Sequence, residues 1–218
     1  PLLMIGGIDI VGSRWLASDL TPRQRDSTNT TVTLNSVNSL DDADFYQYPF
    51  DPGETGGSSG AYRRREQAMR LEFTELAPDD TLEAYRTFSL DETYSRYGAL
   101  SWYATGFEID GYRNQSEDRL FYFVRFSTDE KGDNYYEVKR RVPASVRDSL
   151  RQWINSPVRA DLAAIANFKL NADYPKVAPF LYRVPYGAEG DSVIIKGRPS
   201  FTRLRRISFG LINSSDAS

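Results

Sequence analysis

A ten-residue run that is apolar on both faces near its start, residues 120–129, constrains the fold more than any other part of the sequence. The side chains of a β-strand alternate between the two faces of a sheet, so Leu120 and Tyr122 face one side while Phe121 and Phe123 face the other. A strand that is apolar on both faces near its start must be covered on both sides. This run therefore predicts a central strand.

A short polar turn, residues 131–133, joins this run to a second alternating segment, residues 134–142. Tyr135 and Glu137 face one side of the second segment and Val138 the other, which predicts a half-exposed strand paired antiparallel to the first. We expect the protein to be built around β-sheet.

Further segments alternate in the same way or are rich in β-branched residues. They are residues 4–12, 30–37, 67–74, 83–88, 99–105, 191–196 and 203–212. Short strands separated by turn residues at this spacing favour a mainly β fold over a parallel α/β arrangement. We predict an antiparallel β-sandwich of the jelly-roll or galactose-binding-like type.

One region, about residues 143–170, has apolar side chains at helical spacing. Val146, Leu150 and Trp153 begin the pattern, residues 156–157 (Ser-Pro) interrupt it, and the pattern resumes at Leu162. Two short helices are predicted, forming a helical insertion in the sandwich.

Three connections complete the expected organisation. Residues 41–62 are rich in Asp, Gly, Ser and Pro and predict a flexible loop. Residues 171–190 combine prolines with aromatic residues and are expected to form another loop, and residues 91–98 have room for one helical turn. The sequence as a whole, residues 1–218, is expected to form a single β-sandwich domain.

The composition excludes several classes of function, since none of the 218 residues is Cys or His. Ser-His-Asp and Cys-His nucleophile systems, structural zinc sites, haem ligation and a histidine proton shuttle are ruled out. The 30 Asp and Glu residues could supply a carboxylate pair for glycoside hydrolysis, but no particular pair is indicated. A net charge of −3 argues against a nucleic-acid surface.

The sequence contains no apolar window of about 18 residues, the length that a membrane helix requires, and its first residues do not match a signal peptide. The first residue is Pro1, so we expect the chain to be a piece of a longer protein. On this interpretation, targeting signals and membrane-spanning parts belong to the flanking sequence.

Two groups of acidic and amide side chains lie in predicted turns: Asp41, Asp42 and Asp44, and separately Asp129, Asp133 and Asn134. Their oxygen atoms are ligands of the type that calcium prefers, although neither group has the spacing of an EF-hand. Asp and Asn are also common turn formers, and we prefer this second interpretation. Calcium at Asp129, Asp133 and Asn134 is the minor alternative, and no other cofactor is expected.

Aromatic side chains raise a second possible site, a platform on which a sugar stacks. Trp102 shares a predicted strand face with Leu100 and Ala104, which is the pattern of a core residue. The tyrosines of the Pro-rich loop are better candidates for contact with a partner or a sugar: Tyr174, Tyr182 and Tyr186.

The basic clusters are residues 63–65 and the group Arg203, Arg205 and Arg206. They could bind phosphate or lipid headgroups, but ion pairs with the many acidic residues, or a solvated strand edge, are the preferred interpretation.

Several segments resemble a known family in sequence and in order. They are residues 5–15 (IGGIDIVGSRW), 126–129 (FSTD), 134–137 (NYYE), 162–169 (LAAIANFK) and 197–213 (GRPSFTRLRRISFGLIN). Together they are similar to the SprA family of cell-surface gliding-motility proteins of the Bacteroidetes, and the similarity spans nearly the whole chain.

The resemblance implies a β-rich soluble segment of a very large outer-membrane protein, the translocation channel of the type IX secretion system. It implies protein transport, no catalysis, and a position at the cell surface or in the periplasm without direct membrane insertion of the segment. The expected partners are other parts of the same protein, secretion-system components and secreted proteins, with no nucleic acid. A carbohydrate-binding module is the alternative, and a carboxylate-pair glycosidase comes third.

Overall fold

The structure is a computed structural model of the 218-residue chain. It describes residues 2–6, 16–17, 32–38, 67–73, 76, 79–107, 120–142, 158–187 and 191–214.

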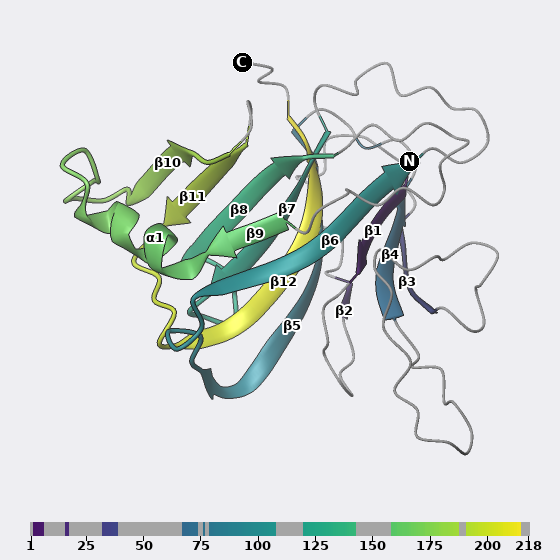
Figure 1. Cartoon of the computed structure of the whole chain (residues 1–218), viewed down its shortest axis with the longest axis horizontal. Helices are drawn as coiled ribbons and strands as arrows, with labels where there is room; N and C mark the ends of the chain where they lie inside the picture. Colours follow the sequence, from purple (N-terminus) through teal and green to yellow (C-terminus); the bar gives the residue numbers. More distant parts are fainter. Residues whose placement is uncertain are drawn as a thin grey trace, which may run out of the picture.

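Most of the described residues belong to two antiparallel sheets (Figure 1). In spatial order, the seven-stranded sheet consists of β10 (Leu181–Pro185), β11 (Ser192–Lys196), β8 (Tyr135–Arg141), β7 (Leu120–Ser127), β12 (Leu204–Asn213), β5 (Thr81–Glu92) and β2 (Leu16–Ala17). The five-stranded sheet consists of β3 (Val32–Asn38), β4 (Gln67–Phe73), β1 (Leu2–Gly6), β6 (Ala99–Phe107) and β9 (Val158–Asp161). The prediction of a mainly β, antiparallel sandwich is confirmed.

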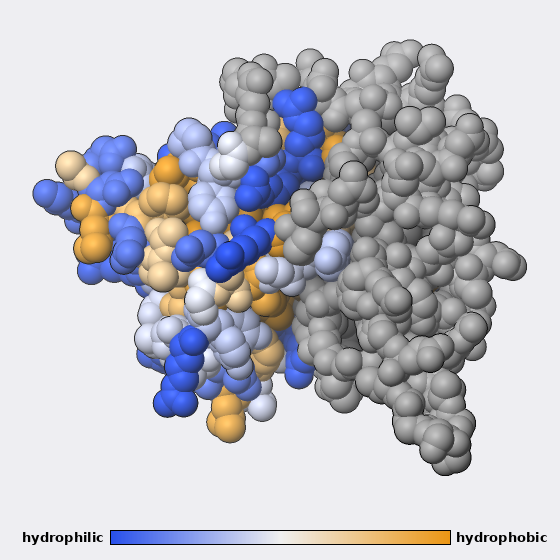
Figure 2. Space-filling view, in the orientation of Figure 1, coloured by the Kyte–Doolittle hydropathy of each residue, from blue (hydrophilic) through white to orange (hydrophobic). Residues whose placement is uncertain are grey.

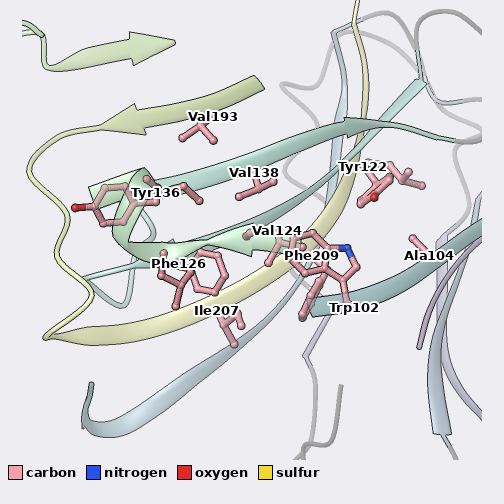
Figure 3. Packing of buried hydrophobic residues seen from close by; sticks show 14 of the residues in the cluster. Trp102, Ala104, Tyr122, Val124, Phe126, Tyr136, Val138, Val193, Ile207 and Phe209 are labelled. Carbon is pink, nitrogen blue, oxygen red and sulfur yellow. The ribbon is translucent and has the colours of Figure 1, made fainter. Parts of the chain in front are cut away.

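The core lies between the large sheet and the strands β6 and β9, which cross over it in Figure 1. In Figure 3 the indole of Trp102 on β6 lies beside Phe209 of the large sheet, near Val124. These three side chains are buried, with at most 1% of their surface exposed. The strand β7 is the fourth of seven in its sheet, and both Phe123 and Val124 are fully buried. The prediction of a central strand covered on both faces is therefore confirmed.

The predicted second helix is present and short. Helix α1 (Leu162–Asn167) buries Leu162 and Ile165, and the 3-10 turn η3 (Phe168–Leu170) follows it. The side chain of Asp161 caps the helix by accepting a hydrogen bond from the backbone N–H of Ala164, at 2.9 Å. The first predicted helix and the loop at residues 41–62 lie outside the described residues.

Three expectations about local structure were wrong. Residues 158–161 lie inside the predicted helical insertion, yet they form β9, because they pair with residues 99–102 of β6. Residues 181–185 lie inside the predicted Pro-rich loop, yet they form β10 and pair with β11. Residues 91–98 contain no helical turn, since β5 continues to Glu92 and a tight turn follows.

Candidate functional site

Tyr174 and Tyr182, two of the three loop tyrosines, lie together in the structure. Their ring centroids are 5.6 Å apart and their planes cross at 81°. The Tyr174 hydroxyl donates to the carbonyl of Gly197 at 3.1 Å. The Tyr182 hydroxyl donates to Oδ1 of Asp173 at 2.6 Å and accepts from the side-chain amide of Asn171 at 3.2 Å. Both hydroxyls therefore have partners within the protein.

The hydrogen bonds and burial also change the acidity of these tyrosines. The hydrogen bond to the Asp173 carboxylate raises the pKa of Tyr182, because an ionised phenol cannot donate it. Desolvation by burial raises the pKa of Tyr174. Neither hydroxyl is activated as a nucleophile or as a base at neutral pH.

Tyr186 lies apart from the other two loop tyrosines. Its hydroxyl accepts a hydrogen bond from the backbone N–H of Asp161, at 3.0 Å, at the start of α1. Its ring makes an edge-to-face contact with Phe168 at a centroid distance of 6.2 Å, and the guanidinium of Arg140 lies 5.2 Å from the centroid of the Tyr186 ring. Tyr186 thus joins α1 to the large sheet and is not part of a row with Tyr174 and Tyr182.

The three tyrosines are half-buried and pack against the hydrophobic core. A sugar platform needs ring faces that are exposed and roughly coplanar, whereas Tyr174 and Tyr182 are nearly perpendicular. Trp102 is 0% exposed, which agrees with its interpretation as a core residue.

The turn residues Asp129 and Asn134 come together as hydrogen-bonding partners. Oδ1 of Asp129 accepts from the backbone N–H of Asp133 at 2.9 Å. Oδ2 accepts from the backbone N–H of Asn134 at 2.8 Å and from its side-chain amide at 3.0 Å. This carboxylate holds the β7–β8 turn in the way expected of a turn former. Among the described residues, no group of three or more Asp or Glu side chains is placed to hold a metal ion.

The acidity of Asp129 follows from the same contacts. Partial burial raises the pKa of its carboxyl group, but the hydrogen bonds from Asp133, Asn134 and Gly132 lower it more, so the pKa lies below its ordinary value. Asp129 is therefore ionised at neutral pH and attracts the donors of its own turn.

A buried charged network that the sequence pattern did not indicate lies on the face of the large sheet opposite the core. Arg125 on β7 donates through Nε to Oε2 of Glu137 on β8, at 2.5 Å, and lies 3.4 Å from Oε2 of Glu83 on β5. Arg206 on β12 donates to the other oxygen of Glu83 at 2.7 Å. Four strands are joined by these four residues, which we call the ionic network.

Aromatic rings cover the ionic network. The Arg125 guanidinium lies 4.0 Å from the ring centroid of Phe123 and 4.7 Å from that of Tyr135, and Arg206 lies 3.9 Å from the centroid of Tyr85. The side chain of Glu137 is only 1% exposed. The prediction that β8 is half-exposed was therefore wrong, since four consecutive residues of β8, Tyr136–Lys139, are buried.

The opposite charges of the network favour each other's ionised forms. Burial alone lowers the pKa of the Arg125 guanidinium, but Glu137 and Glu83 raise it more, so the pKa lies above its ordinary value. Both carboxylates accept hydrogen bonds from arginine, whereas glycoside hydrolysis needs one protonated carboxyl group and one free carboxylate. This arrangement stabilises the sheet and does not form an acid-base pair.

The C-terminal basic cluster is engaged in ion pairs, as the preferred interpretation expected. Arg203 pairs with Asp91 at 2.9 Å, and Arg205 pairs with Asp91 and Glu130. Arg206 belongs to the ionic network. The other basic cluster, residues 63–65, and the acidic group of Asp41, Asp42 and Asp44 lie outside the described residues.

The comparisons add no family assignment, because neither a protein-family model nor a curated protein matches the chain. In the described part of the chain, no helix is long and apolar enough to cross a membrane.

Proposed function

We propose that the chain is a non-catalytic structural and interaction domain of a large outer-membrane protein-secretion channel that serves type IX secretion and gliding motility. The resemblance to the SprA family supports this proposal, and several of its motifs fall on adjacent elements. They lie on β7, β8 and β12, which are neighbours in the middle of the large sheet, and on α1. The shared residues are thus ones that build a fold.

The observation that carries the proposal is the placement of the aromatic side chains. A sugar-binding module would present a planar row of exposed aromatic rings on one sheet face. Here Trp102, Tyr122 and Tyr136 have at most 1% of their surface exposed, and the half-buried loop tyrosines bond to the protein itself. Aromatic side chains that serve packing are those of a structural domain.

As a domain of this kind, the chain contacts other parts of its host protein, other secretion-system components or the proteins being secreted. Its place is the periplasmic or the extracellular side of the outer membrane. Figure 2 shows hydrophilic side chains over the end of the molecule where β10 and α1 lie, with separate apolar side chains among them. A mixed surface of this kind suits protein contacts better than it suits insertion into lipid.

The test begins with the sequence that flanks the chain in its host gene. We expect alternating strands of about ten residues on both sides, as in a membrane barrel. Replacing this segment in the host gene with a short Gly-Ser linker should stop secretion and gliding while the host protein stays in the outer membrane. A host that lacks barrel strands, or full secretion without the segment, would contradict the proposal.

The alternative, a carbohydrate-binding module, predicts a different result in a simpler assay. A sugar present at about 100 times its dissociation constant would stabilise the protein by roughly 2.7 kcal/mol, which a thermal melt detects easily. We expect no such shift with oligosaccharide fragments of cell-surface polysaccharides. A shift that disappears in Tyr182→Ala, with Tyr97→Ala as the exposed control, would overturn the structural role.

A further inference from the structure

The strand β10 is the edge of the large sheet and the outermost strand at that end in Figure 1. It pairs with β11 on one side, and no described strand pairs with its other side. A sheet edge presents backbone N–H and C=O groups that can bind a further strand.

The hydrogen bonds at the two ends of the β10–β11 pair show which backbone groups point outward. The N–H of Gly197 donates to the carbonyl of Phe180, and the N–H of Tyr186 donates to the carbonyl of Asp191. In an antiparallel pair, every second residue exchanges both of its hydrogen bonds with the partner strand. The even-numbered residues of β10 therefore bond to β11, and the backbone groups of residues 181, 183 and 185 point away from it.

Four backbone groups point outward at this edge and have no partner among the described residues. Leu181, Arg183 and Pro185 each direct a carbonyl outward, and Arg183 also directs its N–H outward. The N–H of Leu181 already donates to the carbonyl of Pro179, and Pro185 has no N–H. Arg183 is thus the single residue of the strand that offers a donor together with an acceptor.

The side chains beside these groups are exposed, and two of them are basic. Leu181 is 58% exposed, and Arg183 and Pro185 are also exposed. Lys196 lies directly opposite Leu181 on β11, on the same sheet face as Arg183, and it too is exposed. The chain as a whole has a net charge of −3, so this corner differs from the average surface in carrying two exposed cations.

From this geometry we infer that β10 binds an extended, acidic segment of a partner protein, which adds to the large sheet as a further strand. The backbone of that segment pairs with Arg183 and the flanking carbonyls. Its acidic side chains lie on the face of Arg183 and Lys196. Its apolar side chains lie on the opposite face, beyond Tyr182 and Val184.

The same charges disfavour pairing of two copies of this chain. An antiparallel pair of two β10 strands centred on Arg183 sets two guanidinium groups directly opposite each other, and like charges in that position repel. Strand addition at this edge does not depend on which larger protein contains the chain, so it goes beyond the proposed function.

The probe is a labelled peptide, acetyl-Thr-Glu-Val-Glu-Val-Asp-Thr-amide, with a second peptide that has Lys at the three acidic positions. Fluorescence anisotropy should show that the 218-residue chain binds the acidic peptide and not the basic one. In NMR spectra, the amide of Arg183 should shift on binding and exchange more slowly with solvent. Failure of the acidic peptide to bind at millimolar concentration overturns the inference.

Substitutions at Arg183 separate charge from backbone pairing. Arg183→Glu should weaken binding about fivefold or more by opposing the peptide charge. Arg183→Pro removes both the guanidinium and the outward N–H, whereas Arg183→Ala removes the guanidinium alone, so Arg183→Pro should bind about two- to tenfold more weakly than Arg183→Ala.

Arg159→Glu is the matched control, because Arg159 is also an exposed arginine on a short edge strand, β9. It should leave affinity for the acidic peptide unchanged. Equal weakening by Arg183→Glu and Arg159→Glu would show attraction by overall charge alone and overturn the inference, as would binding without protection of the Arg183 amide.

Discussion

The ionic network gives the sharpest test of the structure, through the substitution Arg125→Met. Methionine keeps much of the apolar stem of arginine, so the main change is the loss of the guanidinium, which lies over the Phe123 ring. Glu137 then loses the donor that lies 2.5 Å from its Oε2. Glu83 keeps the hydrogen bond from Arg206.

The expected cost follows from the burial of Glu137. Its side chain is 1% exposed, and removing one partner of a buried ion pair typically costs about 3 to 5 kcal/mol, because the remaining charge is desolvated and unpaired. For a domain of this size, the cost corresponds to a fall of about 6 to 20 °C in melting temperature. The loss of cation–π contacts with Phe123 and Tyr135 acts in the same direction.

Urea unfolding followed by tryptophan fluorescence measures this cost. Arg205→Met is the matched control, because its partners Asp91 and Glu130 are 45% and 61% exposed, and such a pair contributes less than about 1 kcal/mol. The double variant Arg125→Met with Glu137→Gln should be more stable than Arg125→Met alone, since it leaves no unpaired charge. Equal stability of Arg125→Met and Arg205→Met would refute the buried network.

Three further predictions concern other parts of the fold. Gly210→Ala should destabilise the protein by about 3 kcal/mol or more in urea unfolding, because its Cβ would overlap the Leu82 carbonyl and the Phe123 ring, whereas Gly98→Ala, with open space around it, should cost little. Asp129→Ala should lower stability at pH 7 by about 1 to 3 kcal/mol through the lost turn hydrogen bonds. Because the pKa of this carboxyl is depressed in the folded protein, its stabilising contribution is present above about pH 4 and is lost as the pH falls through the folded pKa. A stability difference between wild type and variant that is the same at pH 7 and pH 2 would contradict this role of Asp129. Burial raises the pKa of Tyr122 and Tyr136, so ultraviolet titration of the folded protein should show phenols that stay protonated above pH 11. The free energy of unfolding should fall as the pH rises above about 10, where the phenols of the unfolded chain ionise. Complete titration of all tyrosines near pH 10 in the folded protein would contradict this burial.

The strands that alternation predicts are those whose pattern is set by burial against the core. Phe121 and Phe123 indicated a strand covered on both sides, and the structure has β7 in the middle of the large sheet. Alternation at period 2 is a property of the local sequence, and for this reason the main strands could be placed from the sequence.

Two short strands could not be placed from the local sequence: β9 has a partner far away in the chain, and β10 contains a proline. Residues 158–161 pair with residues 99–102 across a long stretch of chain. Val158 and Leu162 also fit a helical spacing, so the local pattern could not decide between the two structures. In β10, Pro185 argued for a loop, but an edge strand tolerates proline at a position whose backbone points away from its neighbour.

The contacts of the candidate site residues, like the short strands, could not be predicted from the local sequence alone. Tyr186 was a candidate for contact with a partner or a sugar, yet it accepts a hydrogen bond from the backbone of Asp161 at the start of α1. The burial of Glu137 was missed because a charged residue in an alternating strand normally indicates a solvated face. One signal was present in the sequence: the hairpin that was predicted sets Arg125 opposite Glu137, and a charged pair inside an aromatic run indicates a buried ion pair.

The ionic network also contributes to the register of the large sheet, which the apolar pattern alone does not determine. A slip of one residue exchanges the two faces of a strand and is opposed by the burial of apolar side chains, but a slip of two residues keeps every side chain on its face. In the observed register Arg125 lies opposite Glu137 on β8 and Ser208 on β12. A slip of two residues would set Arg125 opposite Tyr135 or Lys139 on one side, and opposite Arg206 or Gly210 on the other. Both slips against β8 leave the Glu137 carboxylate without its directly opposed arginine, and the slips that set Arg125 opposite Lys139 or Arg206 place like charges together. The network therefore opposes three of these four slips, all of which the apolar pattern allows.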